Sequence, residues 1–199
     1  MNSLGLLYLN GQGVAKNYIK AKYWFEKSAE FNNKYAMCNL GILYENGLGV
    51  PIDISVAKYW YNKAVELNNV NAMNALGSIF EVDEDYKTAK SWYEKAVEYN
   101  NTSSMLNLGR MYRLGNGVEQ DYIKAKYWYD KANELGDVNA YGELLLLETI
   151  NPMNINGFSL ERRKQKTMIY SDQDYKNGWI YLSGNDNEVK LFKEVSEDN

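Results

Sequence analysis

The sequence predicts a mainly α-helical protein, a right-handed α-solenoid of about four helix-turn-helix repeats with a small β-prone C-terminal tail. The first observation is a series of Leu-Gly pairs at regular intervals, with glycines at Gly5, Gly41, Gly77 and Gly109. The second is an Ala-Lys pair ahead of each aromatic cluster, in the same register, with alanines at Ala21, Ala57, Ala89 and Ala125. The period is about 36 residues, typical of stacked helical hairpins, and the third unit has one shortened loop.

Each unit carries two helical patterns. In the second unit, the first pattern places apolar side chains on one helix face, at Ala36, Leu40, Leu43 and Tyr44. The second pattern follows at Ala57, Trp60, Ala64 and Leu67. A short polar residue precedes each second helix and is expected to cap its N-terminus, at Asn17, Asp53, Asp85 and Asp121.

Glycine and asparagine are expected to form the connections. Gly-x-Gly segments join the two helices in three of the units and permit positive φ in a tight turn, starting at Gly11, Gly47 and Gly115. The units themselves are joined by residues that end helices in the left-handed conformation, at Asn32-Asn33, Asn68-Asn69, Asn100-Asn101 and Gly136-Asp137.

The repeats predict two regions. A solenoid is expected over 1–150, with units near 4–33, 34–69, 70–101 and 102–137 and a partial unit over 138–150. Met1 falls inside the first helix, which is therefore short, and Pro152 stops the last one. Residues 151–199 are predicted to form a divergent cap, with a short basic helix over 160–166 and a β-hairpin or meander built from 167–171, 179–183 and 189–195.

Small residues and tryptophans are expected to form the core. The alanine columns let neighbouring helices approach, and a tryptophan column is expected to fill the space between layers, at Trp24, Trp60, Trp92 and Trp128. The pattern does not assign the residues that follow them to core or surface, Phe25, Tyr61, Tyr93 and Tyr129. A platform of exposed aromatic rings for bases or sugars is the alternative.

The fourth unit carries the most complete version of the pattern. It reads Leu108-Gly109, Tyr112, Gly115, Gly117-Val118, Asp121, Lys124-Ala125, Trp128-Tyr129 and Lys131-Ala132. This pattern resembles the Sel1-like repeat, a relative of the tetratricopeptide repeat, and the resemblance covers roughly 1–148. The resemblance implies a fold and a mode of action, namely protein binding and scaffolding, without naming a partner.

The composition excludes several kinds of catalysis. The chain has no histidine and a single cysteine, Cys38, so histidine-based nucleophile activation, histidine or cysteine zinc sites and an intrachain disulfide are ruled out. The Gly-x-Gly segments follow helices and lack a Gly-Lys-Ser/Thr sequence, which favours a turn over a phosphate site. The acidic run 81–85 is interpreted as a solvated loop rather than an acid/base pair or a weak metal site. We therefore expect no catalytic residue, metal or cofactor, and no enzyme.

The charge and hydropathy of the chain limit the classes of partner that it is expected to bind. The net charge of −4 disfavours nucleic acid, and the one basic cluster, 162–166, is interpreted as a solvated helix face rather than a contact for an acidic partner or a membrane. No apolar run approaches the ~20 residues that span a bilayer. The first residues show no signal peptide, so the expected location is cytoplasmic, with no membrane partner.

The first helices of stacked pairs line the concave side. Offsets from each glycine, as in tetratricopeptide-like repeats, predict a protein-binding surface there, formed by Tyr35, Cys38, Ile42, Glu45, Asn71, Asn74, Ser78, Ser103, Leu106, Arg110 and Arg113. Short polar groups suit peptide backbone, and the two arginines, one turn apart, would suit a partner carboxylate. The alternative is that these are solvated helix residues without a partner.

The predicted function is a non-enzymatic scaffold or adaptor that binds another protein or a peptide on this concave surface. The alternative is a dedicated regulator or inhibitor of one enzyme, such as a toxin-immunity protein or a host-directed effector, with the divergent tail supplying specificity.

Overall fold

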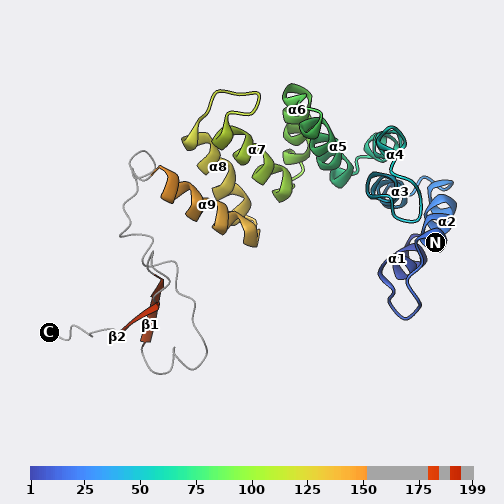
Figure 1. Cartoon of the computed structure of the whole chain (residues 1–199), viewed down its shortest axis with the longest axis horizontal. Helices are drawn as coiled ribbons and strands as arrows, with labels where there is room; N and C mark the ends of the chain where they lie inside the picture. Colours follow the sequence, from blue (N-terminus) through green and yellow to red (C-terminus); the bar gives the residue numbers. More distant parts are fainter. Residues whose placement is uncertain (152–178, 184–188, 194–199) are drawn as a thin grey trace. The chain divides into compact units, whose positions relative to one another are not determined.

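The computed structural model describes residues 1–151, 179–183 and 189–193. The chain divides into two compact units, Met1–Ile150 and Asn151–Asn199. The first unit is an α-solenoid, which confirms the predicted fold class (Figure 1). Its first helices are α1 (Asn2–Asn10), α3 (Lys34–Asn46), α5 (Val70–Val82), α7 (Thr102–Leu114) and α9 (Val138–Ile150). Its second helices are α2 (Tyr18–Ala29), α4 (Ile54–Glu66), α6 (Tyr86–Val97) and α8 (Tyr122–Glu134).

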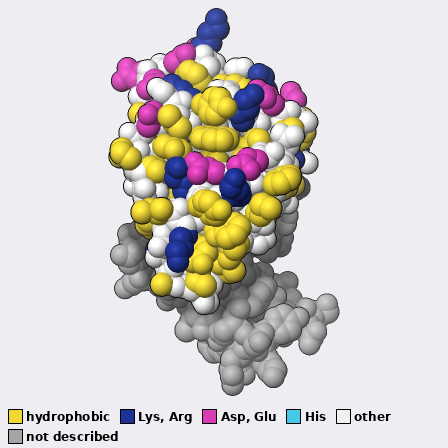
Figure 2. Space-filling model, turned by 90° about the vertical axis from the view of Figure 1, so that its right-hand side faces the viewer, with side chains coloured by type: hydrophobic (Ala, Val, Ile, Leu, Met, Phe, Trp, Pro, Cys, Tyr) yellow, Lys and Arg dark blue, Asp and Glu magenta, His cyan; other side chains and the backbone are white. Residues whose placement is uncertain are grey.

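The helices stack in chain order. The two helices of each unit pack against each other, and each second helix packs against the first helix of the next unit (Figure 1). Neighbouring first helices also touch directly, α3 with α5 and α7 with α9. The first helices therefore form one continuous surface of the solenoid. A different surface, at the side where α1 and α2 lie, carries hydrophobic side chains among basic and acidic ones (Figure 2).

The caps of the second helices are where the sequence placed them. Asn17, Asp53, Asp85 and Asp121 each accept hydrogen bonds from backbone N–H groups in the first turn of α2, α4, α6 and α8. In the asparagine pairs the two members have different roles. The first member takes positive φ, at 56° for Asn32 and 55° for Asn68, as expected. The second member caps the next first helix, since Asn33 and Asn69 accept bonds from the first turns of α3 and α5.

A glycine and an aromatic ring form the centre of each unit. A Cβ built on Gly41 would lie 2.5 Å from Cε1 of Tyr61, and the equivalent glycines meet Phe25, Tyr93 and Tyr129 in the same way. These four rings are completely buried. The four tryptophans are half-buried and pack against the outside of the core, for example Trp60 and Trp92. The space between the two helices of a unit is therefore filled by the residue after each tryptophan, and the tryptophans, expected to be the main core column, are less buried than these rings.

The C-terminal unit contains two described strands. Strand β1 (Trp179–Ser183) pairs antiparallel with β2 (Val189–Lys193), with Trp179 opposite Lys193 and Ser183 opposite Val189. The predicted helix over 160–166 and the predicted run over 167–171 lie outside the described residues. The tail as a whole stays a prediction.

The shortened connection between α5 and α6 predicts a stabilising substitution. Glu84 has a φ of 59° there, in the left-handed region, which costs a residue with a Cβ about 1–2 kcal/mol. Since glycine loses more chain entropy on folding, we expect Glu84→Gly to raise the free energy of unfolding by a net ~0.5–1 kcal/mol. Urea titration measures this. The control is Glu98→Gly, at a φ of −56°, which should instead lower the free energy of unfolding. Destabilisation by Glu84→Gly would contradict the argument.

Candidate functional site

The predicted binding residues come from three neighbouring first helices, α3, α5 and α7. Tyr35, Asn71 and Ser103, near the starts of these helices, are exposed, with Tyr35 at 57%. The half-buried members are Ile42, Glu45, Asn74, Ser78, Leu106, Arg110 and Arg113. We call these ten residues the first-helix surface.

Cys38 does not belong to this surface. Its side chain lies in the core at 6% exposure, and burial raises the pKa of its thiol to about 12. A buried thiol offers no contact to a partner and little thiolate for chemistry. At the same offset in the neighbouring units Asn74 and Leu106 are half-buried, but in the second unit this position is covered.

Amide side chains join neighbouring first helices. The Asn39 amide nitrogen donates to Oδ1 of Asn2 at 3.2 Å, between α3 and α1. The Oδ1 atom of Asn74 accepts from Ser104 Oγ at 2.8 Å and from Asn107 Nδ2 at 3.1 Å, between α5 and α7. The side-chain oxygen of Asn74 is therefore used to hold two repeats together, a role that the sequence argument did not assign to it.

The buried tyrosines reach the first-helix surface with their hydroxyl groups. The Tyr61 hydroxyl donates to Glu45, and the Tyr93 hydroxyl donates to Glu81 at 2.7 Å. Burial raises the pKa of both phenols, which are therefore neutral donors. In the fourth unit the Tyr129 hydroxyl accepts from Arg113. These bonds fix the first-helix side chains to the second helices.

This coupling was readable in the sequence. The residue four positions after each glycine is Leu9, Glu45, Glu81 or Arg113, and the ring opposite is Phe25, Tyr61, Tyr93 or Tyr129. The apolar residue of the first column lies opposite the phenylalanine, and the three charged residues lie opposite the tyrosines. Neither column predicts this coupling by itself, because the pairing is visible only when the two columns are compared.

The two arginines have internal partners. Nη2 of Arg110 donates to both carboxylate oxygens of Glu81, at 3.0 and 3.2 Å. Nε of Arg113 lies 3.8 Å from Oε2 of Glu143, a buried oxygen that has no hydrogen-bond partner in the described part of the chain. The predicted grip of both arginines on one partner carboxylate does not fit this geometry. Each guanidinium faces a different carboxylate of its own chain.

Arg110 is the more accessible of the two. Its side chain is 41% exposed and that of Arg113 15%. Of the guanidinium nitrogens of Arg110, only Nη2 makes a hydrogen bond to a described residue. The other N–H groups of the guanidinium can therefore bind a second acceptor. A hollow of about 340 Å³ lies beside it, lined by Ser78, Glu81, Val82, Tyr86 and Asn116. Two members of the first-helix surface, Ser78 and Arg110, line this hollow.

The described residues offer neither a metal site nor a membrane-spanning helix. No group of three carboxylate, thiol or imidazole side chains in that part of the chain could hold a metal ion. The helices of this part of the chain all lack the length and hydropathy that a membrane span requires.

Comparisons with known proteins agree with this architecture. The family model described as Sel1 repeat matches residues 1–30, 34–69, 70–99 and 102–137. A Sel1 repeat protein from Oxalobacter formigenes is similar in structure, with a TM-score of 0.67 and 35% identity over 72% of this chain. A protective antigen of uropathogenic Escherichia coli strains, described as displaying an SLR fold, has a TM-score of 0.65 and 34% identity over the same share.

The chain spans 60% of the first of these proteins and 32% of the second. No curated protein matches it. Because the four family matches together cover most of the chain and coincide with its four helix pairs, the chain belongs to the Sel1 repeat family.

Proposed function

We propose that this protein is a non-enzymatic scaffold that binds another protein on its first-helix surface. Sel1 repeats generally act as protein-interaction scaffolds, which supports the general class. The proposed location of the binding site rests on Arg110. Its guanidinium is half-exposed, has further N–H groups that can donate, and is held by Glu81 at the edge of a hollow.

The contacts behind Arg110 make it a prearranged anchor. Glu81 is fixed by the buried Tyr93 hydroxyl and is itself only 15% exposed, so Arg110 is held from behind. A guanidinium that is already oriented loses less entropy on binding. A partner carboxylate or backbone carbonyl entering the hollow would be its acceptor.

Site-specific crosslinking tests the location. A photoreactive amino acid replaces Asn71, which is exposed on α5, and in a matched variant it replaces Asn133, which is exposed on α8. We expect a specific adduct in the native lysate from position 71 only. Adducts of the same protein in equal yield from both positions, or from position 133 alone, would exclude the first-helix surface. One stoichiometric enzyme as the adduct would favour the alternative, a regulator of one enzyme, over a scaffold with several clients.

The contribution of Arg110 is a separate prediction. With the crosslinked partner purified, Arg110→Ala should weaken binding by about 1–2 kcal/mol in calorimetric titration. The fold should persist, because Glu81 keeps the Tyr93 hydroxyl as a donor. Lys124→Ala, at a 61% exposed lysine on α8, is the control and should bind as the parent does. Unchanged affinity of the Arg110 variant would place the anchor elsewhere.

A further inference from the structure

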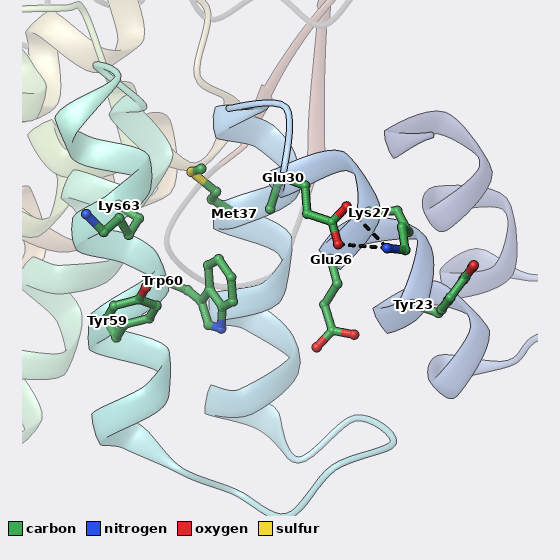
Figure 3. A pocket seen from close by; sticks show the side chains of 9 residues that line it. Tyr23, Glu26, Lys27, Glu30, Met37, Tyr59, Trp60 and Lys63 are labelled. Atoms are coloured by element: carbon green, nitrogen blue, oxygen red, sulfur yellow. Dashed lines mark hydrogen bonds and ion pairs between the residues drawn. The ribbon is translucent and has the colours of Figure 1, made fainter.

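A second hollow lies among the second helices of the repeats. It has a volume of about 540 Å³, opens between α2 and α4, and lies within the range of ~300–1,000 Å³ of ligand pockets. Figure 3 shows Tyr23 and Tyr59 on its two sides, with Trp60 and Met37 between them and with the charged side chains of Glu26, Lys27 and Glu30 between Trp60 and Tyr23. The walls thus combine aromatic rings from two consecutive repeats with charged side chains.

The rings are held in place by packing, but their polar atoms have no hydrogen-bond partner among the described residues. Tyr59 and Trp60 make an edge-to-face contact, with ring centres 5.2 Å apart, and Trp60 also packs against the core. Tyr23 and Tyr59 are 52% and 54% exposed. Within the described residues, the indole N–H of Trp60 and the two tyrosine hydroxyls make no hydrogen bond. The hollow therefore offers flat apolar faces together with three hydrogen-bond donors that no described group of the chain occupies.

The charged groups around the hollow are neutralised within the chain. Lys27 pairs with Glu30 at 2.8 Å and Lys63 with Glu66 at 3.0 Å. The carboxylate of Glu26 is paired with a lysine one turn earlier, Lys22. A strongly charged ligand would have to break these pairs, whereas an uncharged one would not.

The other repeat junctions do not reproduce this site. Between α4 and α6 the second tyrosine is replaced by Ser91, and the ammonium of Lys95 lies over the Trp92 ring at 4.4 Å. The equivalent lysine at the first junction, Lys63, is held by Glu66 instead and leaves Trp60 open. Within the described repeats, two tyrosines flank an uncovered tryptophan only at the junction of α2 with α4.

We propose that this aromatic slot, formed by Tyr23, Tyr59 and Trp60, binds a proline-rich segment of a partner protein in the polyproline II conformation. Such a segment has no internal hydrogen bonds, and its carbonyl oxygens point outward as acceptors. Aromatic-lined grooves with donor groups bind it because its apolar rings stack and its carbonyls accept. The three donors, the two flanking rings and the neutral surroundings match this chemistry. A sugar would instead have to share the carboxylates with the lysines that already pair with them.

This site is separate from the first-helix surface and stands without it. Its test uses the full-length chain, a decaproline peptide and a Gly-Ser peptide of the same length. Two-dimensional ¹H–¹⁵N NMR resolves the indole N–H signals of the five tryptophans, and a Trp60→Phe spectrum assigns the relevant one. We expect decaproline to shift the Trp60 indole signal to saturation while those of Trp92 and Trp128 stay, with an affinity independent of salt. The Gly-Ser peptide should shift nothing.

Substitutions localise the effect. Tyr23→Ala and Tyr59→Ala should each weaken decaproline binding by about tenfold. Tyr127→Ala, at the equivalent position of the fourth unit and 52% exposed, should leave it unchanged. All three positions are half-exposed, and circular dichroism checks that the variants fold. The proposal is overturned if decaproline leaves the Trp60 signal in place, if the Gly-Ser peptide or maltohexaose shifts it equally, or if Tyr127→Ala weakens binding as much as the slot variants do.

Discussion

Replacing Tyr61 with alanine is expected to lower the free energy of unfolding by about 3–5 kcal/mol. The ring is completely buried between α3 and α4, where it fills the space that Gly41 leaves open. Its removal creates a cavity inside a unit that lies between two others, so the loss also weakens the junctions on both sides. Urea titration followed by circular dichroism measures the change.

Two further variants separate the ring from its hydroxyl and from its neighbour. Tyr61→Phe keeps the ring and loses the hydrogen bond to half-buried Glu45, and should cost only ~0.5–1.5 kcal/mol. The first unit already has phenylalanine in this position, Phe25. Trp60→Ala should cost less than Tyr61→Ala, because much of its surface stays in contact with water. If the tryptophan variant were the less stable of the two, the assignment of the core ring would be wrong.

The sequence alone does not show which alanine substitution, that of Trp60 or that of Tyr61, lowers the free energy of unfolding more. Trp60 and Tyr61 are adjacent, large and apolar, and successive helix residues differ by about 100° around the axis. Either residue fits a core-facing stripe when the stripe is inferred from apolar spacing alone. The decisive feature is Gly41, which lies on another helix. Only the pairing of the glycine column with the ring column identifies the buried ring.

Local features were predicted better than contacts between helices. The caps at Asn17, Asp53, Asp85 and Asp121 and the positive φ of Gly47 and Gly115 were correct, because each depends on backbone geometry within a few residues. The repeat itself was correct because four copies in register average out local ambiguity. These features together determine the helix pairs and their order.

The candidate surface was harder to predict for a physical reason. A helix offset gives the direction of a side chain but not its partner. Arg110 and Glu81 are far apart in sequence, yet they meet because neighbouring first helices touch. Buried or half-buried charges tend to find an internal partner before an external one. Sequence therefore placed Arg110 at the surface of its helix and missed the carboxylate that holds it.

Adding a single methyl group at Gly77 is expected to destabilise the solenoid. A Cβ there would lie 2.5 Å from Cε1 and 2.6 Å from Cδ1 of Tyr93, distances that force the ring or the helix to move. The ring is completely buried and its hydroxyl is bonded to Glu81, so it has no free direction in which to retreat. Overpacking of this kind costs about 1–3 kcal/mol, more than the ~1 kcal/mol that alanine gains over glycine as a helix former.

The matched control has the opposite sign. Gly142 is also inside a helix, α9, but a Cβ there meets nothing within 4 Å, so Gly142→Ala should raise the free energy of unfolding by about 0.5–1 kcal/mol. A double-mutant cycle then tests the cause. In a Tyr93→Ala background the clash is gone, and Gly77→Ala should no longer destabilise and should instead show the same gain as Gly142→Ala. If Gly77→Ala cost the same with and without the Tyr93 ring, the glycine would be required by something other than the ring that faces it.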